Sequence, residues 1–199
     1  MSAELPYNSA LKSSRRDGAR NLFKQTSFYQ NERGVIFHHD LCTPLSLQKR
    51  TCYAQAKCVV SDLAWPAGFK RFADRAGVEQ CGPHSRYIAA VRELVDTLAV
   101  PTFLTCSQRD ARALSAQLIT TIELNGQNVP LARFHEEQDY APRSQEMDSL
   151  CLELAARYDS VLDFSCGYGN TLRAFRYFIG SDIDKHCLYY IQKEIMQCR

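Results

Sequence analysis

The fold of this chain is decided near its C-terminus, by the stretch Val161-Leu162-Asp163-Phe164-Ser165-Cys166-Gly167-Tyr168-Gly169-Asn170-Thr171. Its apolar start predicts a buried strand. Gly167 and Gly169 then predict a turn where the backbone passes close to a ligand, because a Cβ atom would collide there. Residues 171–175 are expected to continue as a helix whose first backbone N–H groups lie at the turn.

A second strand, Tyr177 to Asp182, follows this turn and ends on an acid. A carboxylate in that place can accept both hydroxyls of a ribose, as in dinucleotide-binding units. The third glycine of those units is absent, which indicates an adenosine ligand without a pyrophosphate. The alternative interpretation is a strand–helix–strand unit that binds no ligand.

Upstream of the turn, short apolar runs alternate with helical patterns. Strands are expected at Gly34 to His38, Cys58 to Asp62 and Thr102 to Cys106, and helices at 69–78, 85–99, 111–118, 147–158 and 187–196. Asn125-Gly126 predicts a hairpin between runs 119–124 and 129–134. The alternation predicts an α/β fold with a doubly wound, mostly parallel sheet.

The bulk composition describes one ordinary globular domain. The chain has 199 residues, of which 45% are hydrophobic, and a net charge of +2, so no polyanion-binding character extends over the whole molecule. Residues 1–33 form a basic polar arm, which is either a solvated tail or a contact to a phosphate backbone. Residues 34–199 form the domain. No signal peptide and no apolar run of ~18 residues is present, so a cytoplasmic protein without a membrane partner is expected.

The nine cysteines are odd in number and show no Cys-x-x-Cys pair, which favours reduced, buried thiols over a zinc site. Adjacent strand residues His38 and His39 point to opposite faces and cannot easily share one metal. No metal is therefore expected. A catalytic pairing of Cys81 with His84 rests on closeness in the sequence alone.

The glycine turn resembles a motif of one enzyme family. Residues 163–171 are similar to the Asp-Pro-Phe-Cys-Gly-Ser-Gly-Thr motif of the DNA amino-methyltransferases, which methylate N6 of adenine or N4 of cytosine. Residues 177–184 resemble their Tyr-Ile-Gly-Ile-Asp-Ile strand. The resemblance implies a Rossmann-like fold and S-adenosylmethionine (SAM) as the cofactor.

It also implies roles for individual residues. The methionine side of SAM would be lined by Asp163, Ser165, Cys166, Gly167 and Gly169. Asp182 would hold the ribose, and Asp40 would face the adenine end. The family has a phenylalanine where this chain has Ser165, with Phe164 one residue earlier, so the packing at the methionine end differs.

The resemblance extends to an earlier segment in a permuted order, with the catalytic part first. Asp62-Leu63-Ala64-Trp65 stands where the family has Asp-Pro-Pro-Tyr or Asp-Pro-Pro-Trp. By resemblance, Asp62 and a following backbone carbonyl accept hydrogen bonds from the target amine, and Trp65 stacks on a base flipped out of the duplex. Core packing for Trp65 and a strand-end role for Asp62 stay open. The two prolines are missing, which predicts a freer loop, and Pro66, two places late in this catalytic segment, is expected to restore part of the rigidity.

The sequence thus predicts a SAM-dependent methyltransferase acting on DNA, with RNA or a small base-containing molecule as less favoured acceptors. A recognition segment is expected near 107–143, where Arg109, Arg112 and Arg133 are either phosphate contacts or solvated surface. The alternative is a catalytically impaired protein of this fold that binds, scaffolds or inhibits a partner protein. A homodimer also stays open, as does the choice between adenine and cytosine.

Overall fold

The computed structural model of the protein describes residues 28–64, 66–77, 82–117 and 145–197. Its strands are β1 (Phe28–Asn31), β2 (Gly34–His38), β3 (Cys58–Asp62), β4 (Thr102–Thr105), β5 (Ser160–Asp163) and β6 (Tyr177–Asp182). Its α-helices are α3 (Leu47–Tyr53), α4 (Pro66–Ala76), α5 (His84–Leu98), α6 (Gln108–Ala113), α8 (Gln145–Arg157) and α9 (Lys185–Ile191). A 3-10 turn, η1 (Thr171–Ala174), precedes β6, and a π-helical segment, η2 (Gln192–Met196), extends α9.

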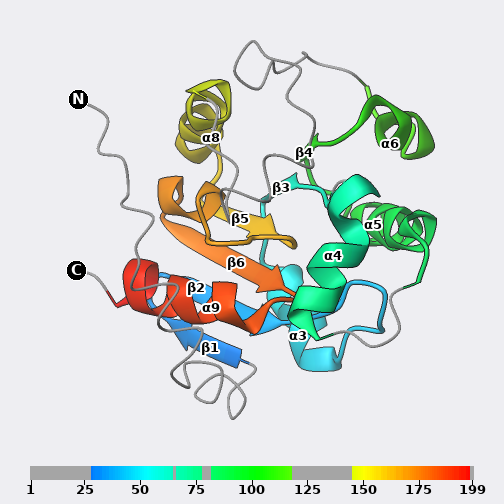
Figure 1. Ribbon diagram of the computed structural model, residues 1–199. Helices are drawn as coiled ribbons and strands as arrows, with labels where there is room; N and C mark the ends of the chain where they lie inside the picture. The colour runs from blue at the N-terminus through cyan, green and yellow to red at the C-terminus, as the bar shows by residue number, and fades with distance from the viewer. Residues whose placement is uncertain (1–27, 65, 78–81, 118–144, 198–199) are drawn as a thin grey trace.

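The strands form one six-stranded sheet in the order β1-β2-β6-β5-β3-β4 (Figure 1). The edge strand β1 pairs antiparallel with β2, whereas β2, β6, β5, β3 and β4 pair in parallel. The connection after β5 leads to its neighbour β6 on one side, and the connection after β3 leads to its neighbour β4 on the other side. The strand order therefore reverses between the adjacent parallel strands β5 and β3. This arrangement confirms the α/β class and the mostly parallel sheet.

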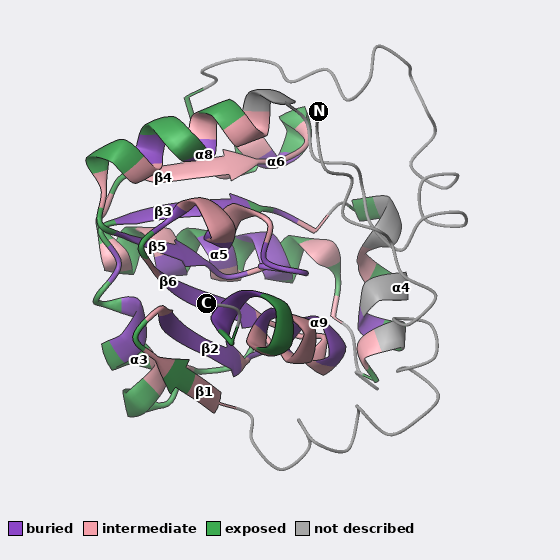
Figure 2. Cartoon of the chain, turned by 90° about the vertical axis from the view of Figure 1, so that its left-hand side faces the viewer, coloured by how far each residue is buried: buried purple, intermediate pink, exposed green. Residues whose placement is uncertain are grey.

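Helices cover both faces of the sheet, because the side chains of each strand alternate between two apolar cores. One core joins Val35, Phe37, Val59 and Leu162 to α3 and α5. The other joins Ile36, Val60, Val161 and Phe178 to α8, η1, α9 and η2. The central strands are buried along most of their length, while β1 and β4 are partly open (Figure 2).

Three local expectations differ from the structure. The predicted helix at 171–175 is wrong: it is a single 3-10 turn, because Phe175 is already extended and β6 begins two residues later. Helix α6 starts earlier than predicted, since Ser107 caps it by accepting a hydrogen bond from Asp110 N. Helix α3 was not predicted, because its only buried residues, Cys52 and Tyr53, come at its end and leave no periodic pattern.

Strand β1 lies inside the segment assigned to the basic arm, so the sheet begins at Phe28 rather than at Gly34. The hairpin expected at 119–134 lies outside the described residues, as do Trp65, Cys81 and Arg133. Within the part of the chain that is described, no helix is long and apolar enough to cross a membrane.

Candidate functional site

The carboxyl ends of the central strands bring three acids to one edge of the sheet. Asp163 ends β5, Asp182 ends β6 and Asp62 ends β3. Asp163 is buried, with 2% of its surface exposed, whereas Asp182 is half-buried and Asp62 is exposed. In open parallel sheets, ligands bind outside the carboxyl ends of the strands where the strand order reverses. This edge, at β5 and β3, is therefore the candidate site.

Asp163 connects strand β3 to the glycine turn through hydrogen bonds. Its Oδ1 atom accepts a hydrogen bond from Ser61 Oγ at 2.8 Å, across 102 positions of the chain, and one from Ser165 N at 3.2 Å. Burial raises the pKa of Asp163 to about 7, and the carboxylates of Asp182 and Asp62 add to the rise. Asp182 and Asp62 thus both lie close enough to Asp163 to act on it electrostatically.

The glycine turn is fixed by Asp182. Gly167 has a φ of 48°, a left-handed conformation that glycine adopts without strain. Its N–H donates to Asp182 Oδ2 at 2.8 Å, and Asp184 N donates to Asp182 Oδ1 at 2.8 Å. An ionised carboxylate has about four acceptor sites. Asp182 therefore supports the turn through both of its carboxylate oxygens.

Two other residues of the turn face the core. A Cβ atom on Gly169 would lie 2.7 Å from Ile195 Cδ1 and 2.9 Å from Ile191 Cγ1, so the packing of α9 and η2 already requires glycine there. Cys166 is buried among the same apolar side chains, and burial raises the pKa of its thiol well above the ordinary value. Ser165 is half-buried and lies between these residues and α5.

The end of β2 lies beside the end of β6. His39 N donates to Asp182 O at 3.0 Å, which brings the following Asp40 to the same edge. Asp40 Oδ1 accepts from Cys42 N at 2.9 Å and closes a tight turn. The imidazole of His39 is 5% exposed, and its pKa is lowered to about 4, first by burial and then by Lys49.

The loop after β3 is held from neighbouring elements. Leu63 N donates to Thr105 O at 2.9 Å, and the Leu63 side chain is buried. Ala64 N donates to the Tyr87 hydroxyl at 3.4 Å, and Ala64 O accepts from His84 Nε2 at 2.8 Å. Pro66 is the first residue of α4, the helical position where proline is favoured, and it is exposed.

The structure adds three functional candidates whose contacts the sequence did not predict: Tyr87, His84 and Asp110. Tyr87 also bonds Ser165 Oγ at 2.9 Å, and His84 Nδ1 lies 3.7 Å from Asp110 Oδ1. Tyr87 and His84 both stand on α5, whose apolar spacing predicted a helix but no partner for its polar side chains. Only the tertiary packing of α5 against the loops shows what these side chains bind.

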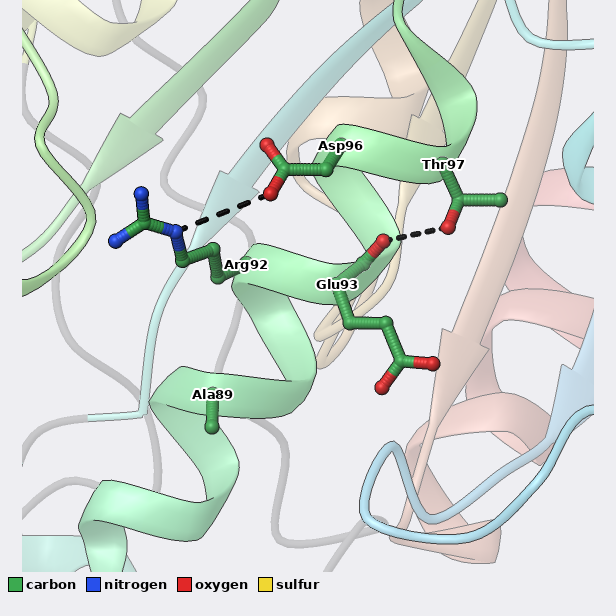
Figure 3. Close-up of a pocket in the computed structure, with 5 residues that line it drawn as sticks. All are labelled: Ala89, Arg92, Glu93, Asp96 and Thr97. Carbon is green, nitrogen blue, oxygen red and sulfur yellow. Dashed lines mark hydrogen bonds and ion pairs between the residues drawn. The ribbon is translucent and has the colours of Figure 1, made fainter.

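Three other features of the described residues give no evidence of a functional site: a surface hollow, the possible metal ligands and the cysteines. A shallow hollow on α5 is lined by Ala89, Arg92, Glu93, Asp96 and Thr97 (Figure 3). All five come from one exposed helix face, where Arg92 pairs with Asp96 and Thr97 bonds Glu93 O, so surface contacts explain it. The described residues hold no group of three or more His, Cys, Asp or Glu side chains suited to a metal. No disulfide joins any two of the seven cysteines that the structure describes.

Comparison of the chain with known protein families, with curated proteins and with solved structures found no match. The site is therefore interpreted from its own residues. The structure brings Asp40, Asp62, Asp163, Ser165, Cys166, Gly167, Gly169, Asp182 and Pro66 to one edge of the sheet.

Proposed function

We propose that this chain is a SAM-dependent methyltransferase that acts on an exocyclic amine of adenine or cytosine in DNA, and that its sheet is of the Rossmann-like type of such enzymes. The observation that carries the proposal is the strand order. It brings the glycine turn after β5, Asp182 after β6 and Asp62 after β3 to one edge, although β3 and β5 are far apart in the chain. In the family that the sequence resembles, the catalytic segment must lie beside the cofactor segment, whichever comes first in the chain.

The charge at this edge supports SAM over other adenosine ligands. The carboxylates of Asp62 and Asp182 both act electrostatically on Asp163, so a positive group that enters beside them is attracted and an anionic one is repelled. SAM carries a sulfonium cation and no phosphate, whereas ATP and NAD carry several negative charges. The donors and acceptors at the edge therefore fit SAM.

Each strand end would hold one part of the cofactor. Asp182 and the backbone of the Gly167 turn would bind the ribose and the methionine part, and Asp40 would face the adenine. Gly169 and Cys166 would contribute through packing, since both face α9 and the core. Ser165 would sit at the methionine end, where its hydroxyl is bonded to Tyr87.

Asp62 would receive the target base. When bound, SAM supplies a methyl group made electrophilic by the adjacent sulfonium. The exposed Asp62 carboxylate would accept an N–H hydrogen bond from the exocyclic amine and favour the pyramidal form, whose lone pair attacks the methyl carbon. A C–N bond would form as the S–C bond breaks, the neutral thioether S-adenosylhomocysteine would leave, and the proton of the amine would pass to water. Positioning accounts for most of the rate enhancement.

DNA is the proposed acceptor because the site is open where Asp62 ends β3, so a base flipped out of a duplex can reach it. Helix α6 follows β4 at this edge and carries Arg109 and Arg112 exposed, as a phosphate contact requires.

Methyl transfer tests the proposal directly. The protein is incubated with labelled SAM and long DNA that lacks methylated amines, and the nucleosides are separated by mass spectrometry. We expect N6-methyladenine or N4-methylcytosine, and a loss of at least about 100-fold in rate for Asp62→Asn with SAM affinity kept. Asp74→Asn, on the exposed surface of α4, is the matched control. SAM binding without transfer to DNA would remove DNA as the acceptor, and failure of SAM to bind would favour the non-catalytic partner protein.

A further inference from the structure

The loop from Asp62 to Ala64 is more firmly held than its sequence predicts. Prolines at positions 63 and 64 would fix two φ angles and so aim the loop's carbonyl groups. This chain has leucine and alanine there, yet both backbone groups of Ala64 are bonded to side chains of α5. Helix α5 therefore performs the restraint that the prolines would have supplied.

Tyr87 restrains the loop through its hydroxyl group. This hydroxyl accepts a hydrogen bond from Ala64 N at 3.4 Å and forms a second hydrogen bond with Ser165 Oγ at 2.9 Å, in which either hydroxyl can donate. The ring is 6% exposed and is packed against Phe69 and His84, with centroids 5.3 and 5.8 Å away. A buried, packed ring has few rotamers, so the hydroxyl is held in one place between the two loops.

His84 restrains the same residue from its other side. Because a carbonyl oxygen only accepts, Nε2 must donate the 2.8 Å hydrogen bond to Ala64 O. The Nδ1 atom faces Asp110 Oδ1 at 3.7 Å. Asp110 is 3% exposed and is itself held by the Ser107 hydroxyl, which donates to Oδ2 at 2.7 Å. Asp110 therefore lies beside the ring nitrogen that does not contact the loop, at a distance too long for a hydrogen bond.

We propose that Tyr87 and His84 are positioning residues that fix the backbone of residues 62–64 and so aim the Asp62 carboxylate at the target amine. This inference rests on the proposed methyltransferase function. Neither side chain needs to touch the base or the cofactor for this role. It predicts that their loss lowers the rate of transfer and leaves cofactor affinity nearly unchanged.

The variants are chosen to remove single groups. Tyr87→Phe deletes the hydroxyl and keeps the packed ring. His84→Met deletes the donor at similar size, and His84→Gln returns an amide N–H near the place of Nε2. Tyr177→Phe is the matched control, since its hydroxyl bonds Gln55 at the opposite end of the sheet.

Two measurements follow each variant. The first is kcat and KM for methyl transfer to DNA, together with the Kd for SAM from calorimetry. The second is acrylamide quenching of Trp65, the only tryptophan of the chain, which directly follows Ala64 and reports on the loop without any reaction.

We expect Tyr87→Phe and His84→Met to lower kcat at least about tenfold, with the Kd for SAM within about threefold of wild type. Quenching of Trp65 should increase in both, and His84→Gln should recover much of the loss. Unchanged kcat and quenching in folded variants would overturn the inference while the proposed function stands. An equal loss of SAM affinity would also overturn it, by making Tyr87 a cofactor-site residue. A wild-type protein that binds no SAM would instead refute the proposed function, and the quenching data would still report whether α5 holds the loop.

Discussion

Asp163 is an acid whose protonation near neutral pH is changed by the fold. Both of its hydrogen bonds, from Ser61 and from Ser165, go to the same oxygen, Oδ1. With a pKa of about 7 in the folded protein, against an ordinary value of 3.8, it becomes charged only near neutral pH. In the unfolded chain the same carboxyl is already ionised there. The folded state therefore loses stability as the pH rises from about 4 to about 7.

Asp163→Asn is expected to remove this pH dependence. The amide oxygen keeps both hydrogen bonds at Oδ1, and no charge is buried. The gain in stability of the variant over wild type should grow as the pH rises from about 4 to about 7, reach about 4 kcal/mol at most, and stay constant at higher pH. Thermal unfolding from pH 4 to 8.5 measures this.

Asp159→Asn, which changes an exposed carboxyl just before β5, serves as the control and should show no such trend. A stability difference between Asp163→Asn and wild type that does not change with pH would contradict the raised pKa.

At the residue scale, the sequence predicted that three strands end on acids, because each of these acids follows an apolar run: Asp62, Asp163 and Asp182. It did not predict the polar contacts of Tyr87 and His84. Their partners lie on loops 20 or more positions away, and no spacing rule connects a helix side chain to such a loop.

Among the elements, the glycine turn and the C-terminal helix depend on each other. Gly169 has a φ of 77°, and Ile191 and Ile195 fill the space where its Cβ would be. The turn can therefore keep its shape only while α9 and η2 stay close. The shape of the candidate cofactor loop therefore depends on the position of the C-terminal helix.

Gly169→Ala is expected to destabilise the protein by more than the left-handed conformation alone, which costs about 1–2 kcal/mol. Gly77→Ala is the matched control, because Gly77 has a φ of 76° but nothing within 4 Å of an added Cβ. Denaturant unfolding of the two variants measures the difference. Equal losses of stability would contradict the packing of Ile191 and Ile195 against the turn.

Elements with strong local signals were predictable, and those made by tertiary context were not. Strands β2, β3 and β6 are apolar runs bounded by polar residues or glycine, and α5 has clear helical spacing. The 3-10 turn η1 replaced a helix because Phe175 is already extended and β6 begins two residues later, at Tyr177. Helix α3 and edge strand β1 carry few buried residues, so neither leaves a pattern in the sequence.

On the scale of the whole molecule, the strand order decides which loops lie next to one another at the edge of the sheet. Alternating strands and helices predicted a parallel α/β sheet but not that β5 would lie between β6 and β3. That order depends on how the crossover helices pack on both faces, which is a property of the assembled cores. It places β5 beside β3 (Figure 1), and so brings the glycine turn after β5 and Asp62 at the end of β3 to one edge.

The central claim is that this edge binds SAM, and calorimetric titration of the purified protein tests it most directly. The wild type and two variants, Asp182→Ala and Asp184→Ala, are titrated with SAM, and the wild type also with ATP. Asp184 caps α9 two residues beyond Asp182, so its loss controls for a loosened turn. We predict saturable micromolar SAM binding, no comparable ATP binding, and at least about a tenfold loss, or 1.4 kcal/mol, for Asp182→Ala only. A folded wild-type protein that binds no SAM, or that binds ATP in its place, would contradict the account.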